Sequence, residues 1–254
     1  MLHPVDRRPD GAPDGPALLE TRRLIKDFGG VRAVAGIDFC MRQGELRCLI
    51  GPNGAGKSTF FKLLTGQVRP TAGAVLFNGR DITALPPHEI ARLGIGIKNQ
   101  VPSVWDGLSV REHLWIAALR RNGARSAAGI AEELLAELDL RSIAARMVGA
   151  LSHGERQWVE MGMVIAQKPA LMLLDEPTAG MAADEVERTA ELLRALNRKT
   201  SIIVVEHDMQ FIQKIAGTVS VLHQGRVLLE DTMEKVLANA VVREVYLGPS
   251  RAAG

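Results

Sequence analysis

The chain has 254 residues, of which 46% are hydrophobic and 24% are charged, and its formal net charge is +2. This composition predicts one large domain, or a core with one inserted lobe, and the low net charge without any Lys/Arg block argues against nucleic acid as a partner. No stretch approaches the roughly 18 apolar residues of a membrane-spanning helix, and the N-terminus lacks the apolar core of a signal peptide, so neither a membrane span nor secretion by that route is expected.

The N-terminal segment, residues 1–17, holds four prolines, two glycines and three aspartates and has no periodic apolar face. Such a composition predicts a disordered extension, with the folded domain beginning near Leu18 and continuing to residue 254. From Leu18 to Ile50, short apolar alternations are separated by glycine-containing turns, which predicts strands joined by tight turns.

A glycine-rich loop directly follows the apolar run from Leu46 to Ile50 and fits the pattern G-x-x-x-x-G-K-[ST]. In such a loop the glycines let successive backbone amides converge on one anion, a lysine adds positive charge, and a hydroxyl reaches a magnesium ion. Apolar residues after the loop predict a helix that ends near Gly66. A loop between a strand and a helix favours a nucleoside triphosphate site over an ordinary glycine-rich turn. The predicted nucleotide-binding residues are Gly51, Pro52, Asn53, Gly54, Ala55, Gly56, Lys57, Ser58 and Thr59, with Ser58 also a magnesium ligand.

After the helix that follows the loop, a further strand is predicted at 74–77. Apolar residues then recur at helical spacing between residues 101 and 150, which predicts an inserted helical lobe. Beyond the lobe, apolar strands at 171–174, 202–205 and 218–222 alternate with helices such as 184–196. This alternation predicts a parallel sheet and therefore an α/β fold. No internal repeat is present.

Two carboxylates, Asp175 and Glu176, end the apolar strand at 171–174. In a parallel sheet the ligand crevice lies at the carboxyl ends of the strands, so both acids are expected to face the nucleotide. Asp175 is predicted to hold magnesium, directly or through water, and Glu176 to polarise a water that attacks the terminal phosphate. An Asp-Glu-Pro turn exposed to solvent is the alternative, and the phosphate loop in the same chain favours the catalytic interpretation.

The segment Leu151-Ser152-His153-Gly154-Glu155 resembles the Leu-Ser-Gly-Gly-Gln signature of ATP-binding cassette (ABC) proteins, and it lies where that family has it, about twenty residues before the Asp175-Glu176 strand end. Ser152 and Glu155 also fit a helix capping box, and either interpretation starts a helix here. The resemblance implies a P-loop NTPase fold with a RecA-like parallel-sheet core, an antiparallel β subdomain and a helical subdomain inserted at about 101–150.

The family resemblance also implies ATP and Mg²⁺ as cofactors and a dimer as the working unit. In this family the signature of one subunit closes over the nucleotide bound to the phosphate loop of the other. Ser152 and Gly154 are therefore expected to donate hydrogen bonds to the terminal phosphate across the dimer.

Three further residues match single positions of the family. Gln100 matches a glutamine that senses magnesium and the attacking water and leads into the helical lobe, and His207 matches a histidine that contacts the terminal phosphate. Phe28 matches an aromatic that stacks on adenine. The alternatives are a metal site with Glu206 and Asp208 for His207, and a place in the core for Phe28.

The chain departs from the common family pattern at three positions. His153 replaces the second signature glycine, Glu155 replaces the glutamine, and Ala182 stands where the family usually has an aspartate. These departures put the contacts across the dimer in question. They also narrow the resemblance, because Leu-Ser-His-Gly-Glu-Arg-Gln-Trp, Glu-Pro-Thr-Ala-Gly-Met and Glu-Val-Tyr-Leu-Gly are similar to the ATP-binding subunits of branched-chain amino acid and urea importers, the urea type above all. The resemblance spans about residues 18–248.

This subfamily implies an ATPase that drives uptake of a small polar solute, with urea expected and branched-chain amino acids or short amides as the alternative. It further implies a second cassette, identical or paralogous, two integral-membrane permease subunits, indirectly a solute-binding protein, and a peripheral place on the cytoplasmic face of the membrane. Trp105 and Trp115 lie where a permease helix would dock, although tryptophans of a small lobe favour a core position.

A different class of function is a non-transport ABC ATPase that acts on DNA or ribosomes. The relatives that act on DNA carry a long coiled-coil insertion between phosphate loop and signature, where this chain has about ninety residues, and those that act on ribosomes carry two cassettes. A P-loop kinase or small GTPase leaves the signature, Gln100 and His207 unexplained. The sequence therefore favours the importer ATPase.

Overall fold

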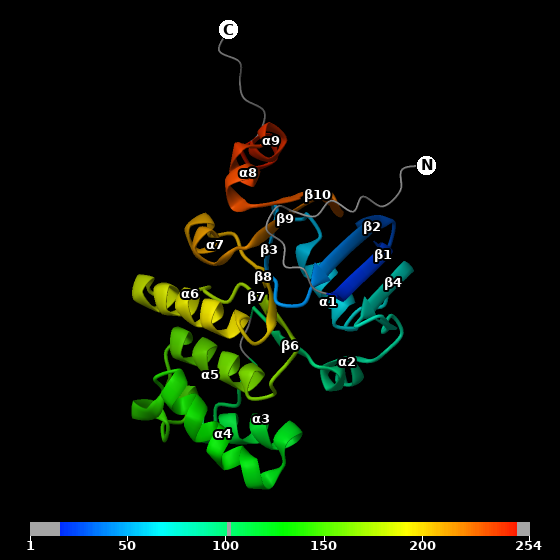
Figure 1. Cartoon of the computed structure of the whole chain (residues 1–254). Coiled ribbons are helices and arrows are strands. Elements are labelled where there is room, and N and C mark those ends of the chain that lie inside the picture. Colours follow the sequence, from blue (N-terminus) through cyan, green and yellow to red (C-terminus); the bar gives the residue numbers. More distant parts are fainter. Residues whose placement is uncertain (1–15, 101–102, 248–254) are drawn as a thin grey trace.

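The computed structural model describes residues 16–100 and 103–247, and it places them in two sheets and a set of helices (Figure 1). The strands are β1 (Ala17–Phe28), β2 (Val31–Arg42), β3 (Leu46–Ile50), β4 (Ala72–Phe77), β5 (Arg80–Asp81), β6 (Ile95–Lys98), β7 (Leu171–Asp175), β8 (Ser201–Val205), β9 (Thr218–His223) and β10 (Arg226–Asp231). The helices are α1 (Lys57–Leu64), α2 (Pro87–Leu93), α3 (Val110–Asn122), α4 (Ala124–Glu137), α5 (His153–Ile165), α6 (Ala183–Asn197), α7 (Met209–Ile215), α8 (Met233–Ala238) and α9 (Ala240–Leu247), with short 3₁₀ turns at Arg141–Ile143 and Val148–Ala150.

The six-stranded sheet has the order β10-β9-β3-β8-β7-β6, and every neighbouring pair from β9 to β6 is parallel. All five residues of β3 and of β8 are buried, as expected for strands covered on both faces. Only β10, which pairs with β9 as a hairpin at one edge, is antiparallel. The parallel sheet that the alternation of strands and helices predicted is therefore confirmed.

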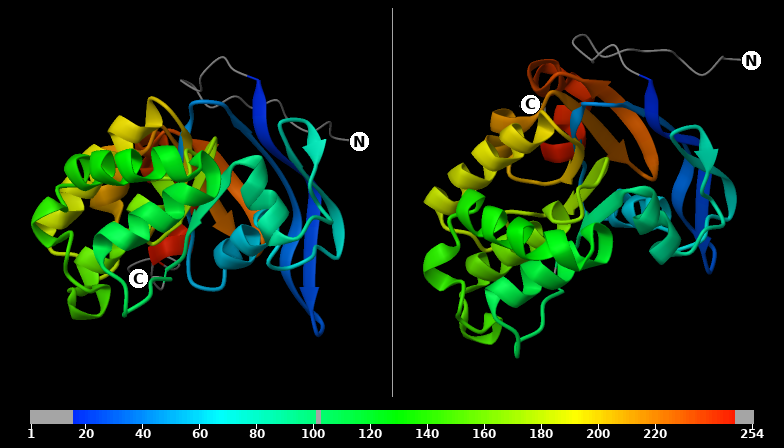
Figure 2. Two further views of the ribbon diagram at one scale, coloured as in Figure 1. Left: turned by 90° about the horizontal axis from the view of Figure 1, so that it is seen from below. Right: turned by 60° about the horizontal axis from the view of Figure 1, so that its bottom comes forward.

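The second sheet is antiparallel, with the order β2-β1-β4-β5, and it lies beside the parallel sheet (Figures 1 and 2). Helix α1 joins the two sheets, because the ring of Phe60 on α1 packs edge-on against Phe39 of β2, with 5.5 Å between ring centroids. One continuous apolar cluster includes these rings together with inward-facing residues of β1, β4 and β8. Residues from the antiparallel sheet therefore pack directly around the helix that follows the phosphate loop.

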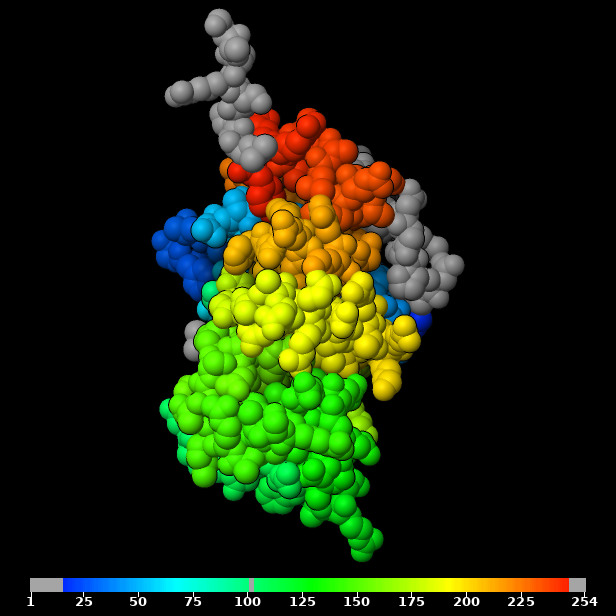
Figure 3. Space-filling model, turned by 90° about the vertical axis from the view of Figure 1, so that its left-hand side faces the viewer, coloured from blue at the N-terminus to red at the C-terminus, as the bar shows by residue number. Residues whose placement is uncertain are grey.

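The opposite face of the parallel sheet is covered by α5, α6 and α7, and the α3–α4 hairpin packs on α5 to form the helical lobe (Figures 2 and 3). Helix α3 begins with a complete capping box, in which Ser109 and Glu112 exchange hydrogen bonds. Trp105 and Trp115 are 55% and 39% exposed, so the expectation that they belong to the core of the lobe is wrong. The lobe is instead filled by small and branched side chains such as Ala118, Ala131 and Leu135.

The predicted disordered extension lies almost entirely outside the described residues. Of that segment, Ala17 already pairs with Arg42 in the antiparallel sheet, and the carbonyl of Pro16 accepts a hydrogen bond from the Gln43 amide, so the fold begins slightly earlier than predicted. Across the described residues, no helix is both long and apolar enough to cross a bilayer.

Candidate functional site

Four neighbouring parallel strands carry the predicted site residues beyond their carboxyl ends. In the sheet order β3, β8, β7 and β6 are adjacent, and they are followed by the phosphate loop, His207, Glu176 and Gln100 respectively. Because parallel strands end at the same edge of a sheet, residues that are more than 150 positions apart in the chain lie together. This edge is the candidate site.

The phosphate loop has glycines where no other residue fits. Gly51 and Gly56 have φ angles of 154° and 100°, and a Cβ at these positions would lie 2.3 Å from the Leu222 carbonyl oxygen and 2.5 Å from that of Ala33. The neighbouring turn fixes the loop from outside, because the Gly225 amide donates to the Ala55 carbonyl at 3.0 Å. The loop is thus held between β2 and the β9–β10 hairpin in a conformation that only glycines adopt without strain.

Lys57, the first residue of α1, folds its side chain back over the loop. Its ammonium donates to the carbonyl oxygens of Gly51 at 2.5 Å and Pro52 at 3.0 Å. Burial lowers the pKa of Lys57, while the nearby carboxylates of Glu176 and Asp175 raise it. The lysine charge is therefore located where the loop backbone would meet an anion.

Glu176 is held in an unusual backbone conformation at the end of β7. Its φ angle is 45°, in the left-handed region that non-glycine residues rarely adopt, and its amide donates to the Val205 carbonyl at 2.9 Å. The Gln100 side-chain amide donates to Glu176 Oε2 at 2.7 Å. The structure thus brings together two of the predicted catalytic residues that the sequence separates by 76 positions.

Asp175 lies just inside the site, as the last residue of β7. Burial raises the pKa of Asp175, the neighbouring Glu176 carboxylate raises it further, and the lysines Lys98 and Lys57 oppose both effects. A bound cation nearby would stabilise the ionised form of a carboxylate in such a position.

His207 and Glu206 follow β8. His207 is 71% exposed, and its Nδ1 lies 3.7 Å from Glu176 Oε1 and from Glu206 Oε2. Glu206 is buried and accepts hydrogen bonds from the Thr178 hydroxyl at 2.5 Å and from the His207 amide at 3.0 Å. It therefore ties the loop after Glu176 to the loop that carries His207. Sequence analysis named Glu206 only as a possible metal ligand, and no cluster of three or more His, Cys, Asp or Glu suited to a metal occurs among the described residues.

The signature residues begin α5 and contact α6 rather than the phosphate loop. Ser152 and Glu155 form the alternative that the sequence allowed, a complete capping box, with the Ser152 amide donating to Glu155 at 2.7 Å. A Cβ at Gly154 would lie 2.4 Å from a Glu185 carboxylate oxygen. Within the described part of one chain, no hydrogen bond or ion pair joins Ser152 or Gly154 to residues 51–59.

Sequence analysis predicted one aromatic residue for the site, and the structure adds a second. Phe28, at the end of β1, is 45% exposed with the Lys26 ammonium 4.8 Å from its ring centroid, so a place in the core is wrong for it. Tyr246 of α9 was not predicted as a site residue. Burial raises the pKa of Tyr246 to about 12, and a hydrogen bond from the backbone of Gly51 opposes that shift. The last helix therefore reaches the first residue of the phosphate loop, a contact that no local motif signals.

Comparison with known proteins shows that this chain is similar to ATP-binding proteins of ABC transporters. A family model described as "ABC transporter" matches residues 34–179. The lipopolysaccharide export system ATP-binding protein LptB of Acidithiobacillus ferridurans is 35% identical over 91% of this chain and 97% of that protein. The high-affinity branched-chain amino acid transport ATP-binding protein BraF of Pseudomonas aeruginosa is 31% identical over 91% of this chain and 98% of that protein. A crystal structure of a nucleotide-free ATP-binding cassette from an ABC transporter is similar with a TM-score of 0.82 and 26% identity, covering 92% of this chain and 100% of that chain.

Proposed function

Because the chain belongs to the ABC transporter family of ATP-binding proteins, we propose that it is the ATP-hydrolysing subunit of an importer whose solute is urea. The fold is the ATP-binding cassette that the sequence resemblance predicted, with a parallel core, an antiparallel sheet and a helical lobe. The chain is accordingly an ATP-hydrolysing module. The observation that carries the catalytic part of the proposal is the 2.7 Å hydrogen bond from Gln100 to Glu176 at the strand end beside the phosphate loop.

The phosphate loop fits the ATP phosphates, because Gly51 and Gly56 leave no room for side chains and the Lys57 ammonium lies over the loop. Hard oxygen ligands suit Mg²⁺, and the Ser58 hydroxyl, the Asp175 carboxylate and the Gln100 amide oxygen supply them. The raised pKa of Asp175 supports this assignment, since a cation nearby relieves the cost of its charge. Bound Mg²⁺ and ATP would supply the electrophilic terminal phosphate with part of its charge neutralised.

The chain's own residues then activate and place a water molecule. Glu176 accepts the proton of the attacking water as general base, and Gln100, which donates to Glu176, orients both. His207 is exposed beside Glu176 and contacts the terminal phosphate. Phe28 is exposed at the edge of the antiparallel sheet and stacks on the adenine ring.

The signature residues Ser152 and Gly154 act on the nucleotide of a second cassette. In support, Ser152 is exposed at the start of α5, and within the described residues neither Ser152 nor the buried Gly154 makes a polar contact with the phosphate loop of its own chain. The amides at the N-terminus of α5 suit an anion. His153, Glu155 and Ala182 are the positions near this contact that depart from the common family pattern, and the partner cassette is identical or paralogous.

Transport requires further partners, namely two integral-membrane permease subunits and indirectly a solute-binding protein. We place the chain peripherally on the cytoplasmic face of the membrane, with the exposed Trp105 and Trp115 of the helical lobe toward a permease. ATP binding closes two cassettes, and hydrolysis reopens them. The urea assignment rests on the motifs around His153 and Gly180, while the likeness to BraF supports a branched-chain amino acid as the second candidate.

The test is uptake of labelled urea and labelled leucine in cells of the source organism whose only copy of this chain carries Glu176→Gln. We expect urea uptake to fall to background while leucine uptake is unchanged. Glu191→Gln is the matched control, because Glu191 is an exposed glutamate on α6, and it should leave both uptakes intact. Loss of leucine uptake alone would transfer the assignment to amino acids, and no change in either would contradict the importer proposal for both solutes.

A further inference from the structure

A buried ion pair joins β6 to α5 next to Gln100, and only its lysine entered the site described so far, through the effect of Lys98 on the pKa of Asp175. Lys98 is the last residue of β6, and Glu160 lies in the second turn of α5. Their side chains are 0% and 5% exposed, and Lys98 Nζ lies 3.8 Å from Glu160 Oε2. The pair connects the strand that leads to Gln100 with the helix that begins at the signature.

The Lys98–Glu160 pair reaches the backbone on both sides of Gln100. Glu160 Oε1 accepts a hydrogen bond from the Ser103 amide at 3.0 Å. Lys98 in turn donates to the Asn99 carbonyl at 3.2 Å. Both flanks of Gln100 are therefore hydrogen-bonded to this buried pair, one flank to each partner.

A second residue of the same helix reaches Gln100 itself. Gln157, one turn before Glu160, is fully buried, and its Nε2 lies 3.5 Å from the Gln100 carbonyl and 3.0 Å from His153 Nε2. Because Gln100 donates to Glu176, a continuous series of contacts runs from the start of α5 to the candidate catalytic carboxylate.

Stability alone does not explain a buried pair of this kind. Burial raises the pKa of Glu160 and lowers the pKa of Lys98, so each charge is disfavoured where it lies. Replacing such a pair by two apolar residues of similar size is often neutral or stabilising. Apolar residues cannot replace the carboxylate that accepts from the Ser103 amide or the ammonium that donates to the Asn99 carbonyl.

We propose that Glu160 is a positioning residue, which holds the Gln100 segment so that the Gln100 side chain meets Glu176, with Lys98 beside the Glu160 carboxylate holding it in place. Movement of α5 thereby changes the geometry of hydrolysis. This inference rests on the roles proposed above for Gln100 and Glu176.

The first test is steady-state ATP hydrolysis by the full-length chain carrying Glu160→Gln. We expect kcat to fall roughly 10- to 100-fold, as for a catalytic group displaced by about 1 Å, with KM for ATP unchanged because the phosphate loop is untouched. The matched control is Glu45→Gln, which removes one carboxylate from a buried ion pair with Arg47 that is distant in the sheet order from β6. Both variants lower Tm, and only Glu160→Gln should lower kcat at a temperature where both are folded.

The double variant Lys98→Met/Glu160→Met separates positioning from stability. It removes both buried charges, so Tm should recover toward the wild-type value, while kcat should stay low because the Ser103 amide and the Asn99 carbonyl lose their partners. Recovery of kcat together with Tm would overturn the proposal and leave the pair a merely structural one.

A double-mutant cycle with Gln100→Ala tests whether Glu160 acts through Gln100. If it does, Glu160→Gln lowers kcat in the wild-type background and has little further effect once Gln100 is alanine. Additive losses would contradict the proposal. Glu176→Gln, measured alongside, distinguishes failure of the proposed catalytic roles from failure of the positioning role. Unchanged turnover in Glu176→Gln contradicts the proposed catalytic roles. Lost turnover in Glu176→Gln together with an additive Glu160 effect contradicts only the positioning role.

Discussion

At the residue scale, the two carboxylates at the end of β7 are held in positions that cost the folded chain stability. Glu176 has a φ angle of 45°, and a non-glycine residue in that region costs about 1–3 kcal/mol unless its surroundings compensate. The hydrogen bond from its amide to the Val205 carbonyl and the one from Gln100 supply that support. Asp175 is charged beside Glu176 and partly buried, which raises its pKa.

A first prediction follows for Asp175→Asn in the protein without nucleotide. The raised pKa means that the folded state binds the Asp175 proton more tightly than the unfolded state does, so this residue adds stability at low pH and loses it as pH rises through the folded pKa. Replacement by neutral asparagine should therefore raise Tm at pH 7 and leave it nearly unchanged near pH 3. The measurement is thermal unfolding of both proteins across pH, with magnesium removed by chelator.

The same variant should lose magnesium-dependent ATP hydrolysis. A lower Tm than wild type at pH 7 would show that the Asp175 charge is stabilised in the folded chain, and it would contradict the burial effect on which the prediction depends. Asp184→Asn, at an exposed position in the first turn of α6, is the control, and it should not raise Tm.

At this scale, the sequence predicts the parts of the site that lie within one short motif and misses those that depend on distant residues. The residues from Gly51 to Thr59 lie within one short segment, so their identity and spacing were sufficient to place them. The left-handed conformation of Glu176 and the contact of Tyr246 with Gly51 depend on partners far away in the chain, and no short pattern encodes them.

At the element scale, α5 combines two roles in its first turn. Ser152 caps the helix by accepting from the Glu155 amide at 3.2 Å, and the same residue is proposed to contact the nucleotide of a second cassette. Helix α3 has a matching capping box at Ser109 with no proposed contact to nucleotide. The two helices therefore form an internal comparison.

The second prediction concerns Ser152→Ala. Loss of the cap should lower the free energy of unfolding by about 1 kcal/mol, and loss of the hydroxyl should also lower ATP turnover. Ser109→Ala should cost similar stability without affecting turnover of the purified chain. Chemical denaturation and steady-state hydrolysis measure the two effects.

Ser152→Asn separates the cap from the contact, because asparagine is also a good N-cap. We expect its stability to return to that of wild type while its turnover stays low. Full recovery of turnover would contradict the proposed contact of the serine hydroxyl with a second nucleotide.

Element boundaries were largely predictable, since apolar runs and breaking residues are local. The helix predicted at 184–196 extends over Ala183–Asn197, and the strand predicted at 171–174 extends over Leu171–Asp175. The exposure of Trp105 and Trp115 was not predictable from periodicity, because small residues such as Ala118 and Ala131 fill the lobe instead.

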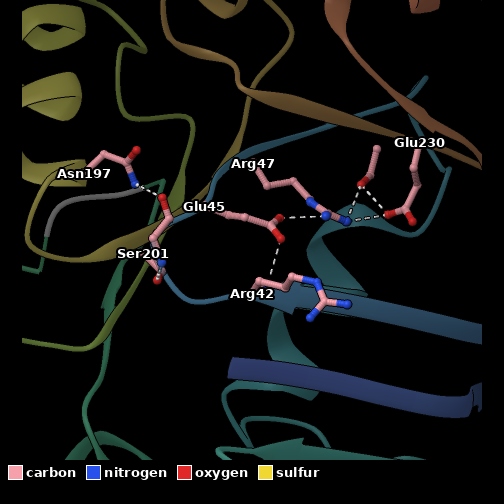
Figure 4. Close-up of polar contacts among 8 residues, drawn as sticks. Arg42, Glu45, Arg47, Asn197, Ser201 and Glu230 are labelled. Atoms are coloured by element: carbon pink, nitrogen blue, oxygen red, sulfur yellow. Dashed lines mark hydrogen bonds and ion pairs between the residues drawn. The ribbon is translucent and has the colours of Figure 1, made fainter. Parts of the chain in front are cut away.

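At the scale of the whole molecule, one buried charge cluster marks the point where the chain passes from the antiparallel to the parallel sheet (Figure 4). Arg47 of β3 forms 2.7 Å ion pairs with Glu45 and with Glu230 of β10, and its guanidinium lies 4.9 Å from the ring centroid of Phe39 on β2. Glu45 also accepts from the Arg42 amide at 2.8 Å. The cluster fixes the two sheets around the strand that leads into the phosphate loop.

The third prediction is that Arg47→Met lowers the free energy of unfolding by about 3–5 kcal/mol, because it leaves the buried Glu45 carboxylate and the partly buried Glu230 carboxylate without their cation. Arg111→Met is the control, since Arg111 pairs with Glu132 at an exposed site, and it should change stability little. Equal effects of the two variants in urea denaturation would contradict the role assigned to the cluster.

The strand order was the part of the whole molecule that sequence left open. Alternation of strands and helices predicted a parallel sheet, but the pairing of β3 with β8 joins residues more than 150 positions apart. This order brings Gln100, Glu176 and His207 to one edge beside the phosphate loop. The family resemblance could imply that arrangement, whereas hydrophobic periodicity could not.

The central claim, that this chain hydrolyses ATP with Glu176 as general base, is tested most directly by turnover and nucleotide binding of Glu176→Gln beside wild type. We predict that kcat falls by roughly 10²- to 10⁴-fold, the usual effect of losing a positioned general base, while the Kd for ATP stays the same. Wild-type turnover in Glu176→Gln would contradict it.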